Sequence, residues 1–415
     1  PQTVDTNLPI LTTAQQALDL GVEFTRHFPH PVCFRGMVTY AERGASMIYV
    51  QDESAGIRVV YTNTDYRPVA GQVVTVEGTA AAGTFAAFVN RAGVRVEGTG
   101  PMPEPHQASA ARLAAGELSG QWVQVEGVVR DLAKDPERAE LFVSSGGLRF
   151  HAVIQPFAGA ALPTEWLDAR VILRGVCWTE VDAESKPTGF TLYVPGTNQL
   201  FVSQSGKTDP FGQSPPSLSS QPELRRQSDS RVKVAGVVAF HSPSGHLYVD
   251  DGQGPIHARL LVPLARDNPR AQYVERPRLA PLRPGERVEI VGAPTAAMFA
   301  PLLQDAEVRR AGTSAPPAAV AATIGEIFSG RHEGRLVTLK ARLLANETGQ
   351  AGALKQQVLA LQSGDTIFEA LWEFAGTNTL PNLLKNSYLQ VSGICAVQLG
   401  ELNQIRSFRL WLREP

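Results

Sequence analysis

The chain has 415 residues, too many for one hydrophobic core, and its 43% hydrophobic and 19% charged residues are typical of a folded globular protein. The formal net charge of −2 argues against a general attraction to nucleic acids, because proteins that bind them usually carry a basic excess. No membrane-spanning run and no signal peptide are present, and Pro1 is not a natural start, so we expect a processed or excised piece of a longer protein.

The N-terminal segment, residues 1–30, should contain one short helix that begins after Thr12 or Thr13. Residues 31–100 then alternate apolar and polar side chains in short runs separated by turn residues, which predicts about five strands. The first of these runs has Gly36 at its centre.

The same order of strands and turns recurs three more times. Residues 120–203 carry Gly127 at the centre of their first run, and residues 229–312 carry Gly236 there. Residues 332–415 are more divergent and are expected to have Arg342 at this position. The chain is therefore interpreted as an array of four repeats.

Each repeat is expected to form a small closed sheet. A glycine in the middle of the first strand lets that strand bend sharply and belong to both halves of a barrel, which is the plan of the five-stranded OB fold. We therefore predict an all-β protein, a tandem array of four small five-stranded OB-like barrels with short linker helices. An ordinary sandwich of similar strands is the alternative.

The segments between the repeats differ in composition. Residues 101–119 and 313–331 each combine prolines with a short helical pattern, and residues 204–228 form a longer linker rich in Pro and Ser. Proline stiffens such linkers, so we expect a fixed, elongated arrangement of the barrels.

No sequence motif for catalysis, for a cofactor or for a conventional metal site is present, and the three widely spaced cysteines should be buried free thiols. The acidic residues Asp52 and Asp250, at corresponding strand ends, could hold a cation but are expected to satisfy backbone donors in turns. His246 and His257 could face each other across a hairpin, but two ligands alone do not predict a metal site.

The strongest polar cluster lies in the third repeat, where arginines that could bind an anion surround a tyrosine. Residues 229–312 nevertheless contain 11 Lys and Arg against 9 Asp and Glu, so a solvated, charge-balanced loop is the default interpretation and an anion-binding loop the alternative. The candidate ligand-binding residues are Arg259, Arg266, Arg270, Tyr273, Arg276 and, on a neighbouring strand, Tyr248. The same stretch also contains Arg278, Arg283 and Arg287.

Aromatic residues on the first two strands of repeats one and three could stack a base or a sugar, but packing in the barrel cores is the favoured explanation. These residues are Tyr40, Tyr49, Phe240 and Tyr248.

Several stretches together resemble the N-terminal extracytoplasmic region of large bacterial membrane-bound sensor histidine kinases. They include the stretch from Pro31 to Tyr40, Val76-Glu77-Gly78, and the linker and strand from Leu118 to Val129. The likeness covers nearly the whole chain and is weakest in the fourth repeat. It implies a periplasmic input region without catalytic residues, followed in the parent protein by a transmembrane helix and a kinase.

The sequence thus favours a non-catalytic sensor region of a two-component system that binds an unknown small anionic ligand or a partner protein. Nucleic acid is an unlikely partner, membrane contact would come only through segments absent from this chain, and the oligomeric state is open. Single-stranded nucleic-acid binding and a purely structural spacer or interaction scaffold are the alternatives.

Overall fold

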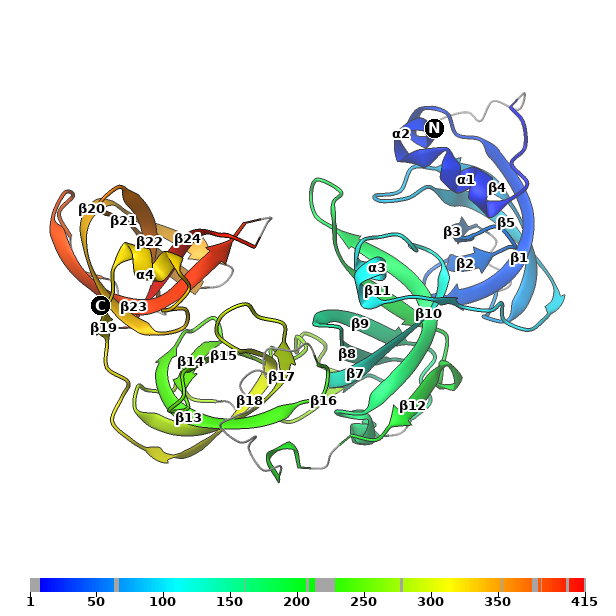
Figure 1. Ribbon diagram of the computed structural model, residues 1–415. Helices are drawn as coiled ribbons and strands as arrows, with labels where there is room; N and C mark the ends of the chain where they lie inside the picture. Colours follow the sequence, from blue (N-terminus) through cyan, green and yellow to red (C-terminus); the bar gives the residue numbers. More distant parts are fainter. Residues whose placement is uncertain are drawn as a thin grey trace. The chain divides into compact units, whose positions relative to one another are not determined.

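The computed structural model describes residues 8–62, 67–159, 161–206, 209–212, 228–276, 279–351, 354–374, 380–381, 383–400 and 403–413. Within them the chain is built from strands grouped into four small barrels, with a few short helices (Figure 1). The predicted all-β array of OB-like barrels is confirmed.

The first two barrels use the N-terminal half of the chain. In barrel 1, α1 and α2 precede five strands, and in barrel 2, β6 and α3 precede five strands and a short added strand. The elements of barrel 1 are α1 (Ala14–Asp19), α2 (Gly21–His27), β1 (Pro31–Ala41), β2 (Met47–Gln51), β3 (Gly56–Tyr61), β4 (Gln72–Ala81) and β5 (Phe88–Thr99). Those of barrel 2 are β6 (His106–Gln107), α3 (Ala110–Ala114), β7 (Trp122–Lys134), β8 (Ala139–Ser145), β9 (Leu148–Ile154), β10 (Arg170–Val181), β11 (Pro187–Val194) and β12 (Leu200–Gln204).

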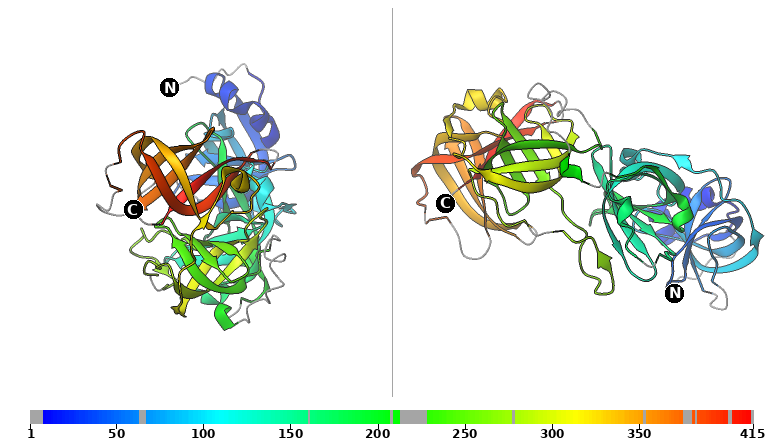
Figure 2. Two further views of the ribbon diagram at one scale, coloured as in Figure 1. Left: turned by 60° about the vertical axis from the view of Figure 1, so that its left-hand side comes forward. Right: turned by 90° about the horizontal axis from the view of Figure 1, so that it is seen from below.

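Barrels 3 and 4 follow the same plan, and Figure 2 shows their strands from two further directions. The elements of barrel 3 are β13 (Val232–His241), β14 (His246–Asp250), β15 (Pro255–Leu260), β17 (Glu286–Thr295) and β18 (Leu302–Thr313), with β16 (Gln272–Tyr273) between β15 and β17 in sequence. Those of barrel 4 are β19 (Val320–Ala321), α4 (Ile324–Phe328), β20 (Leu336–Ala351), β21 (Leu354–Ser363), β22 (Thr366–Phe374), β23 (Tyr388–Leu399) and β24 (Ile405–Leu412).

All four barrels share one strand order. Barrel 1 closes in the order β1-β2-β3-β5-β4 and barrel 3 in the order β13-β14-β15-β18-β17, while the pairings of β10 with β7 and of β20 with β23 close barrels 2 and 4 in the same way. In each barrel the third and fifth strands run parallel and the other neighbours antiparallel. This is the OB order, and apolar side chains fill each interior.

The glycines at the centre of the first strands occupy equivalent places. Gly36, Gly127 and Gly236 each lie two residues before a bulge, where the first strand passes from its fourth-strand partner to its second-strand partner. A Cβ at Gly36 would lie 2.8 Å from the carbonyl oxygen of Gln51, and one at Gly236 would lie 2.9 Å from that of Asp250. Glycine is therefore needed for close approach of the two strands.

The prediction for the fourth repeat was wrong by one residue. The bulge in β20 lies between Leu343 and Ala345, so the residue two positions before it is Ala341, not Arg342. Arg342 instead pairs with Tyr388 and donates a hydrogen bond to Gln362. Buried Ala341 holds the place of the glycine, so the strands of barrel 4 accommodate a methyl group there.

The chain divides into two compact units, one of residues 1–207 with 264–275 and one of residues 208–263 with 276–415. The excursion 264–275 lies in the third repeat by sequence but belongs to the first unit. There β16 pairs with the end of β7, and the Leu264 amide donates to Asp131 at 2.9 Å. Unit 1 is thus barrels 1 and 2 plus this segment, and unit 2 is the rest of barrel 3 with barrel 4.

Within each unit the first barrel packs the aromatic face of its first two strands on the second barrel. In unit 1, Tyr40 and Tyr49 of barrel 1 are buried against Trp122, Val176 and Tyr193 of barrel 2. The Tyr40 and Tyr193 rings stack with centroids 5.1 Å apart.

In unit 2, Phe240 and Tyr248 of barrel 3 are buried against Leu336, Ile394 and Trp411 of barrel 4. These five residues hold the same places in strand register as the five of unit 1. The four aromatic residues are therefore buried by packing, but in the contacts between barrels and not in the barrel cores as predicted.

Candidate functional site

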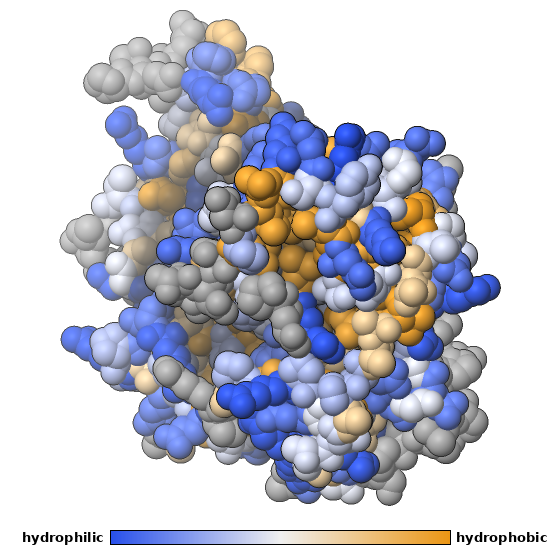
Figure 3. Space-filling view, turned by 90° about the vertical axis from the view of Figure 1, so that its left-hand side faces the viewer, coloured by the Kyte–Doolittle hydropathy of each residue, from blue (hydrophilic) through white to orange (hydrophobic). Residues whose placement is uncertain are grey.

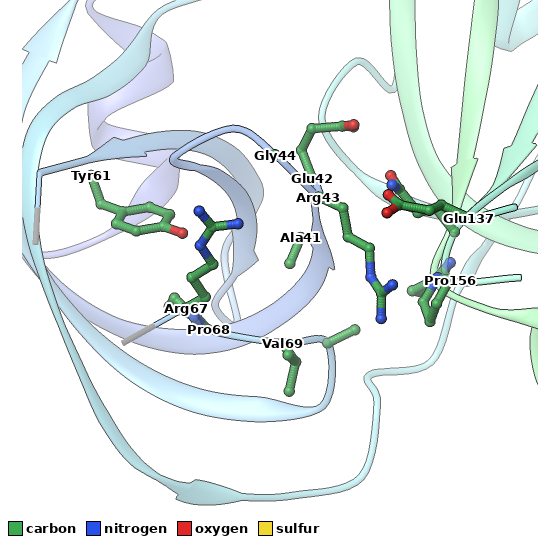
Figure 4. Close-up of a pocket in the computed structure, with 13 residues that line it drawn as sticks. Ala41, Glu42, Arg43, Gly44, Tyr61, Arg67, Pro68, Val69, Glu137 and Pro156 are labelled. Atoms are coloured by element: carbon green, nitrogen blue, oxygen red, sulfur yellow. The ribbon is translucent and has the colours of Figure 1, made fainter. Parts of the chain in front are cut away.

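The first unit contains a cavity of about 620 Å³ between barrels 1 and 2 (Figure 4). Barrel 1 contributes the loop that joins β1 to β2, the end of β3 and the residues that precede β4. Barrel 2 contributes the β7–β8 loop and the residues that follow β9 and β11. The lining residues are Ala41, Glu42, Arg43, Gly44, Tyr61, Arg67, Pro68, Val69, Ala70, Glu137, Gln155, Pro156 and Pro195.

The β1–β2 loop is shaped by its own sequence. Gly44 has a φ of +86°, a conformation that suits glycine, and its turn lets the chain reverse between β1 and β2. Glu42 and Arg43 therefore stand at the start of the turn beside the cavity. In OB barrels this loop and the adjoining sheet face are common binding surfaces.

A buried tyrosine ties the loop to barrel 2. The Tyr40 hydroxyl lies 3.0 Å from Glu42 Oε2 and 3.0 Å from Gln155 Oε1. Since a hydroxyl has one proton, it donates to one of these acceptors at a time. Burial, reinforced by the negative charge of Glu42, raises the pKa of Tyr40, so this hydroxyl stays protonated and keeps donating.

Charged groups of both signs face the cavity without pairing. Arg43 and Arg67 supply guanidinium groups, and Glu42 and Glu137 supply carboxylates. In the part of the chain that the structure describes, none of the four forms an ion pair. Figure 4 shows Arg67 beside Tyr61 on the barrel 1 side and Glu137 beside Pro156 on the barrel 2 side. Such convergent polar groups in a cavity of this size fit a small-molecule site.

The predicted arginine cluster is divided between the two units. Arg266, Arg270 and Tyr273 lie in the segment that belongs to unit 1. There the Arg266 guanidinium donates to the Val274 carbonyl and lies 5.7 Å from the centre of the Tyr273 ring, so both side chains help to shape this segment. Arg270 is exposed.

The other predicted residues belong to unit 2. Arg259 is exposed on β15, whereas Arg276 pairs with Glu307 at 2.7 Å, an acceptor that it shares with Arg231. Burial alone would raise the pKa of Glu307, but these two guanidinium groups lower it. Arg278 lies outside the described residues.

Tyr248 is 2% exposed, and its ring stacks on that of His257 at 4.2 Å. It is therefore part of the contact between barrels 3 and 4. His257 Nε2 lies 2.9 Å from His246 Nδ1 across the hairpin, as predicted. Burial lowers the pKa of His246 to about 4 and that of His257 to about 3, so both rings are neutral near pH 7.

The acidic strand ends serve turns, as predicted. Asp52 accepts hydrogen bonds from the amides of Ser54 and Ala55, and Asp250 accepts one from that of Gly252. Among the described residues, no group of three or more His, Cys, Asp or Glu is placed to hold a metal ion. No helix among them is long and apolar enough to cross a membrane.

Unit 2 also exposes apolar surface. Figure 3 shows apolar side chains gathered in a hollowed area bordered by polar ones. Among the most exposed large apolar residues of barrel 4 are Ile367, Leu384 and Tyr388, with 61%, 73% and 84% of their surface accessible. Exposed apolar surface points to contact with another macromolecule more than to a small polar ligand, so the cavity of unit 1 is the stronger candidate site.

No residue of this cavity was predicted from the sequence. Its walls come from six separate loops and strand ends, and no motif spacing connects them. The one usable signal was the β1–β2 turn of the first repeat, which carries adjacent charges of opposite sign, Glu42 and Arg43, beside a glycine.

No family model and no curated protein matches the chain. Among solved structures, a chain described as an aspartyl-tRNA synthetase from Leishmania major Friedlin is 16% identical over 27% of this chain and 24% of that chain, with a TM-score of 0.21. A murine DNA-binding protein bound with double-stranded DNA is 12% identical over 43% of this chain and 99% of that chain, with a TM-score of 0.24. A replication protein A heterotrimer bound to single-stranded DNA is 5% identical over 70% of this chain and 92% of that chain, with a TM-score of 0.19.

Proposed function

We propose that this chain is a non-catalytic recognition region that binds a small molecule in the cavity of unit 1. The observation that carries the proposal is the set of unpaired charged groups lining a cavity of about 620 Å³ between two barrels. A ligand there would contact the β1–β2 loop of one barrel and the β7–β8 loop of the next, and would therefore favour one arrangement of the two.

The resemblance to sensor histidine kinases suggests what such a change would serve. In that setting the chain is the periplasmic input region of a two-component signalling protein, and the bound ligand alters the region that leads to the membrane helix and the kinase. The full reading frame tests this part of the proposal. Absence of both a membrane helix and a kinase module from the encoded protein would refute it.

Ligand binding is tested by filling the cavity. Ala70 lines it, and A70W would occupy much of its volume, whereas A183W places the same indole on the exposed β10–β11 turn outside it. Thermal-shift and calorimetric measurements with amino acids, dicarboxylates, sugar phosphates and nucleotides should find a compound that stabilises the wild type and A183W but not A70W. If every compound that binds the wild type binds A70W with the same affinity, the cavity is not the binding site.

Single-stranded nucleic-acid binding is the second candidate, and one surface of barrel 2 favours it. Phe142 holds the place that Tyr49 and Tyr248 hold in barrels 1 and 3, yet it is only partly buried, with exposed His151 opposite it on β9. Arg149 lies 5.2 Å from the Phe142 ring. Flat groups of this kind can stack bases.

Two observations weigh against this candidate. The corresponding faces of barrels 1 and 3 are buried, and unit 1 has 18 Lys and Arg against 23 Asp and Glu. Fluorescence anisotropy with a labelled oligothymidylate decides between the candidates. Binding that weakens with salt and is lost in F142A would favour nucleic acid, and its absence at low salt would exclude it.

A further inference from the structure

The charges that line the cavity of unit 1 specify a chemical class of ligand. A site for an anion would present mainly cationic groups, and a site for a cation mainly carboxylates. This cavity presents two of each, Arg43 and Arg67 with Glu42 and Glu137. Within the described residues these groups satisfy neither one another nor a third residue by ion pairing.

Resting on the function proposed above, we infer that the cavity binds a small zwitterion, a molecule with one carboxylate and one ammonium group, such as a short peptide with free ends. Arg67, on the barrel 1 side of the cavity, receives the carboxylate, which an arginine binds through parallel N–H donors. The carboxylate of Glu137, on barrel 2, receives the ammonium group. The ligand thus spans the two barrels.

The remaining wall fits such a molecule. Val69, Pro156 and Pro195 give apolar contacts, and the volume of about 620 Å³ lies within the roughly 300–1,000 Å³ typical of small-molecule sites. The buried Tyr40 hydroxyl lies within hydrogen-bond distance of Glu42 and Gln155 and donates to one of them at a time. Glu42 and Glu137 would repel a ligand with two negative charges, while Arg43 and Arg67 would repel a simple amine.

Three probes of one shape separate the two charges. Trialanine has both, N-acetyl-trialanine keeps only the carboxylate, and trialanine amide keeps only the ammonium group. By isothermal titration calorimetry at pH 7, trialanine should bind at least about tenfold more tightly than either blocked form, because each lost charge-assisted contact contributes on the order of 1.5–3 kcal/mol.

Single substitutions assign each charge to its partner. R67Q should abolish the preference for trialanine over its amide and keep the preference over the N-acetyl form, whereas E137Q should do the opposite. R95Q, at an arginine whose side chain is 75% exposed outside the cavity, should change neither preference. Circular dichroism and the unfolding temperature confirm that each variant is folded.

Two results would overturn the inference. Equal affinity for trialanine and N-acetyl-trialanine, or equal competition by succinate, would make the cavity an anion site. Lack of binding by all three peptides would also refute the zwitterion, whatever the A70W comparison shows. The proposed recognition function is tested independently. It is refuted only if no class of compound binds the wild type more tightly than A70W.

Discussion

Glu333 should make the stability of barrel 4, in unit 2, depend on pH. This residue lies in the loop between α4 and β20, where its Oε2 accepts a hydrogen bond of 2.6 Å from the Val397 amide, and no described cation pairs with it. The next residue, Gly334, lies against barrel 3, since a Cβ there would be 3.1 Å from that of Pro255. Burial raises the pKa of Glu333 from 4.5 to about 7, although the Val397 amide partly offsets the increase.

The direction of the effect follows from proton linkage. Folded barrel 4 holds the Glu333 proton more tightly than the unfolded chain, so the contribution of this residue to stability is greatest below pH 4.5, falls between pH 4.5 and about 7, and is then level. One pKa unit corresponds to about 1.4 kcal/mol, so the total loss from this residue is about 3 kcal/mol. E333Q keeps an acceptor for the Val397 amide and cannot ionise, and should therefore remove this loss.

The measurement is hydrogen exchange of peptides from β20 and β23 at pH 4.5 and pH 8, corrected for intrinsic rates. The free energy of opening in E333Q relative to the wild type should rise by about 3 kcal/mol between the two values of pH. E347Q, at an exposed glutamate of the same barrel, should show no such rise. A difference between E333Q and the wild type that is the same at both pH values would refute the reasoning.

Three further predictions concern the barrels and their contacts. W122A should destabilise unit 1 by about 3–5 kcal/mol in urea unfolding, because the fully buried Trp122 joins its two barrels; a change below about 1 kcal/mol would contradict that role. D168A should lower the stability of barrel 2 by about 3 kcal/mol, measured in the same way, because it removes the carboxylate that pairs with the buried Arg130 at 2.7 Å, whereas an equal loss in R130M/D168A would argue against the lost ion pair as the cause. Cys177 and Cys395 are fully buried, and burial raises the pKa of Cys177 to about 12, so Ellman's reagent should label both thiols only in denaturant; rapid labelling of either in the native protein would contradict the barrel interiors described here.

Local rules predicted the barrels well. Alternating side chains, turn residues and a central glycine are properties of single strands, and the barrels follow from them because Gly36, Gly127 and Gly236 lie where close strand approach admits only a hydrogen. The Thr13 cap of α1 was predictable for the same reason, since its side chain accepts from the Gln16 amide three residues on.

Contacts between barrels were beyond such rules. Nothing near Leu264 in the sequence indicates that this segment pairs with β7, because the interaction depends on Asp131, more than a hundred residues earlier. The arginine cluster was chosen by proximity in sequence, and the same segment boundary divides it. The position of Arg342 was misjudged because one residue of register is set by a bulge that composition does not reveal.

The matching contacts of Tyr40 with Tyr193 and of Phe240 with Trp411 limit how barrels can be added to such a chain. Without the barrel that follows it, barrel 1 or barrel 3 would expose its aromatic face to solvent. A chain that gained one such barrel alone would therefore be prone to aggregation. Gain or loss of two barrels at once leaves no aromatic face uncovered. The matching contacts therefore favour lengthening of such a chain by two barrels at a time.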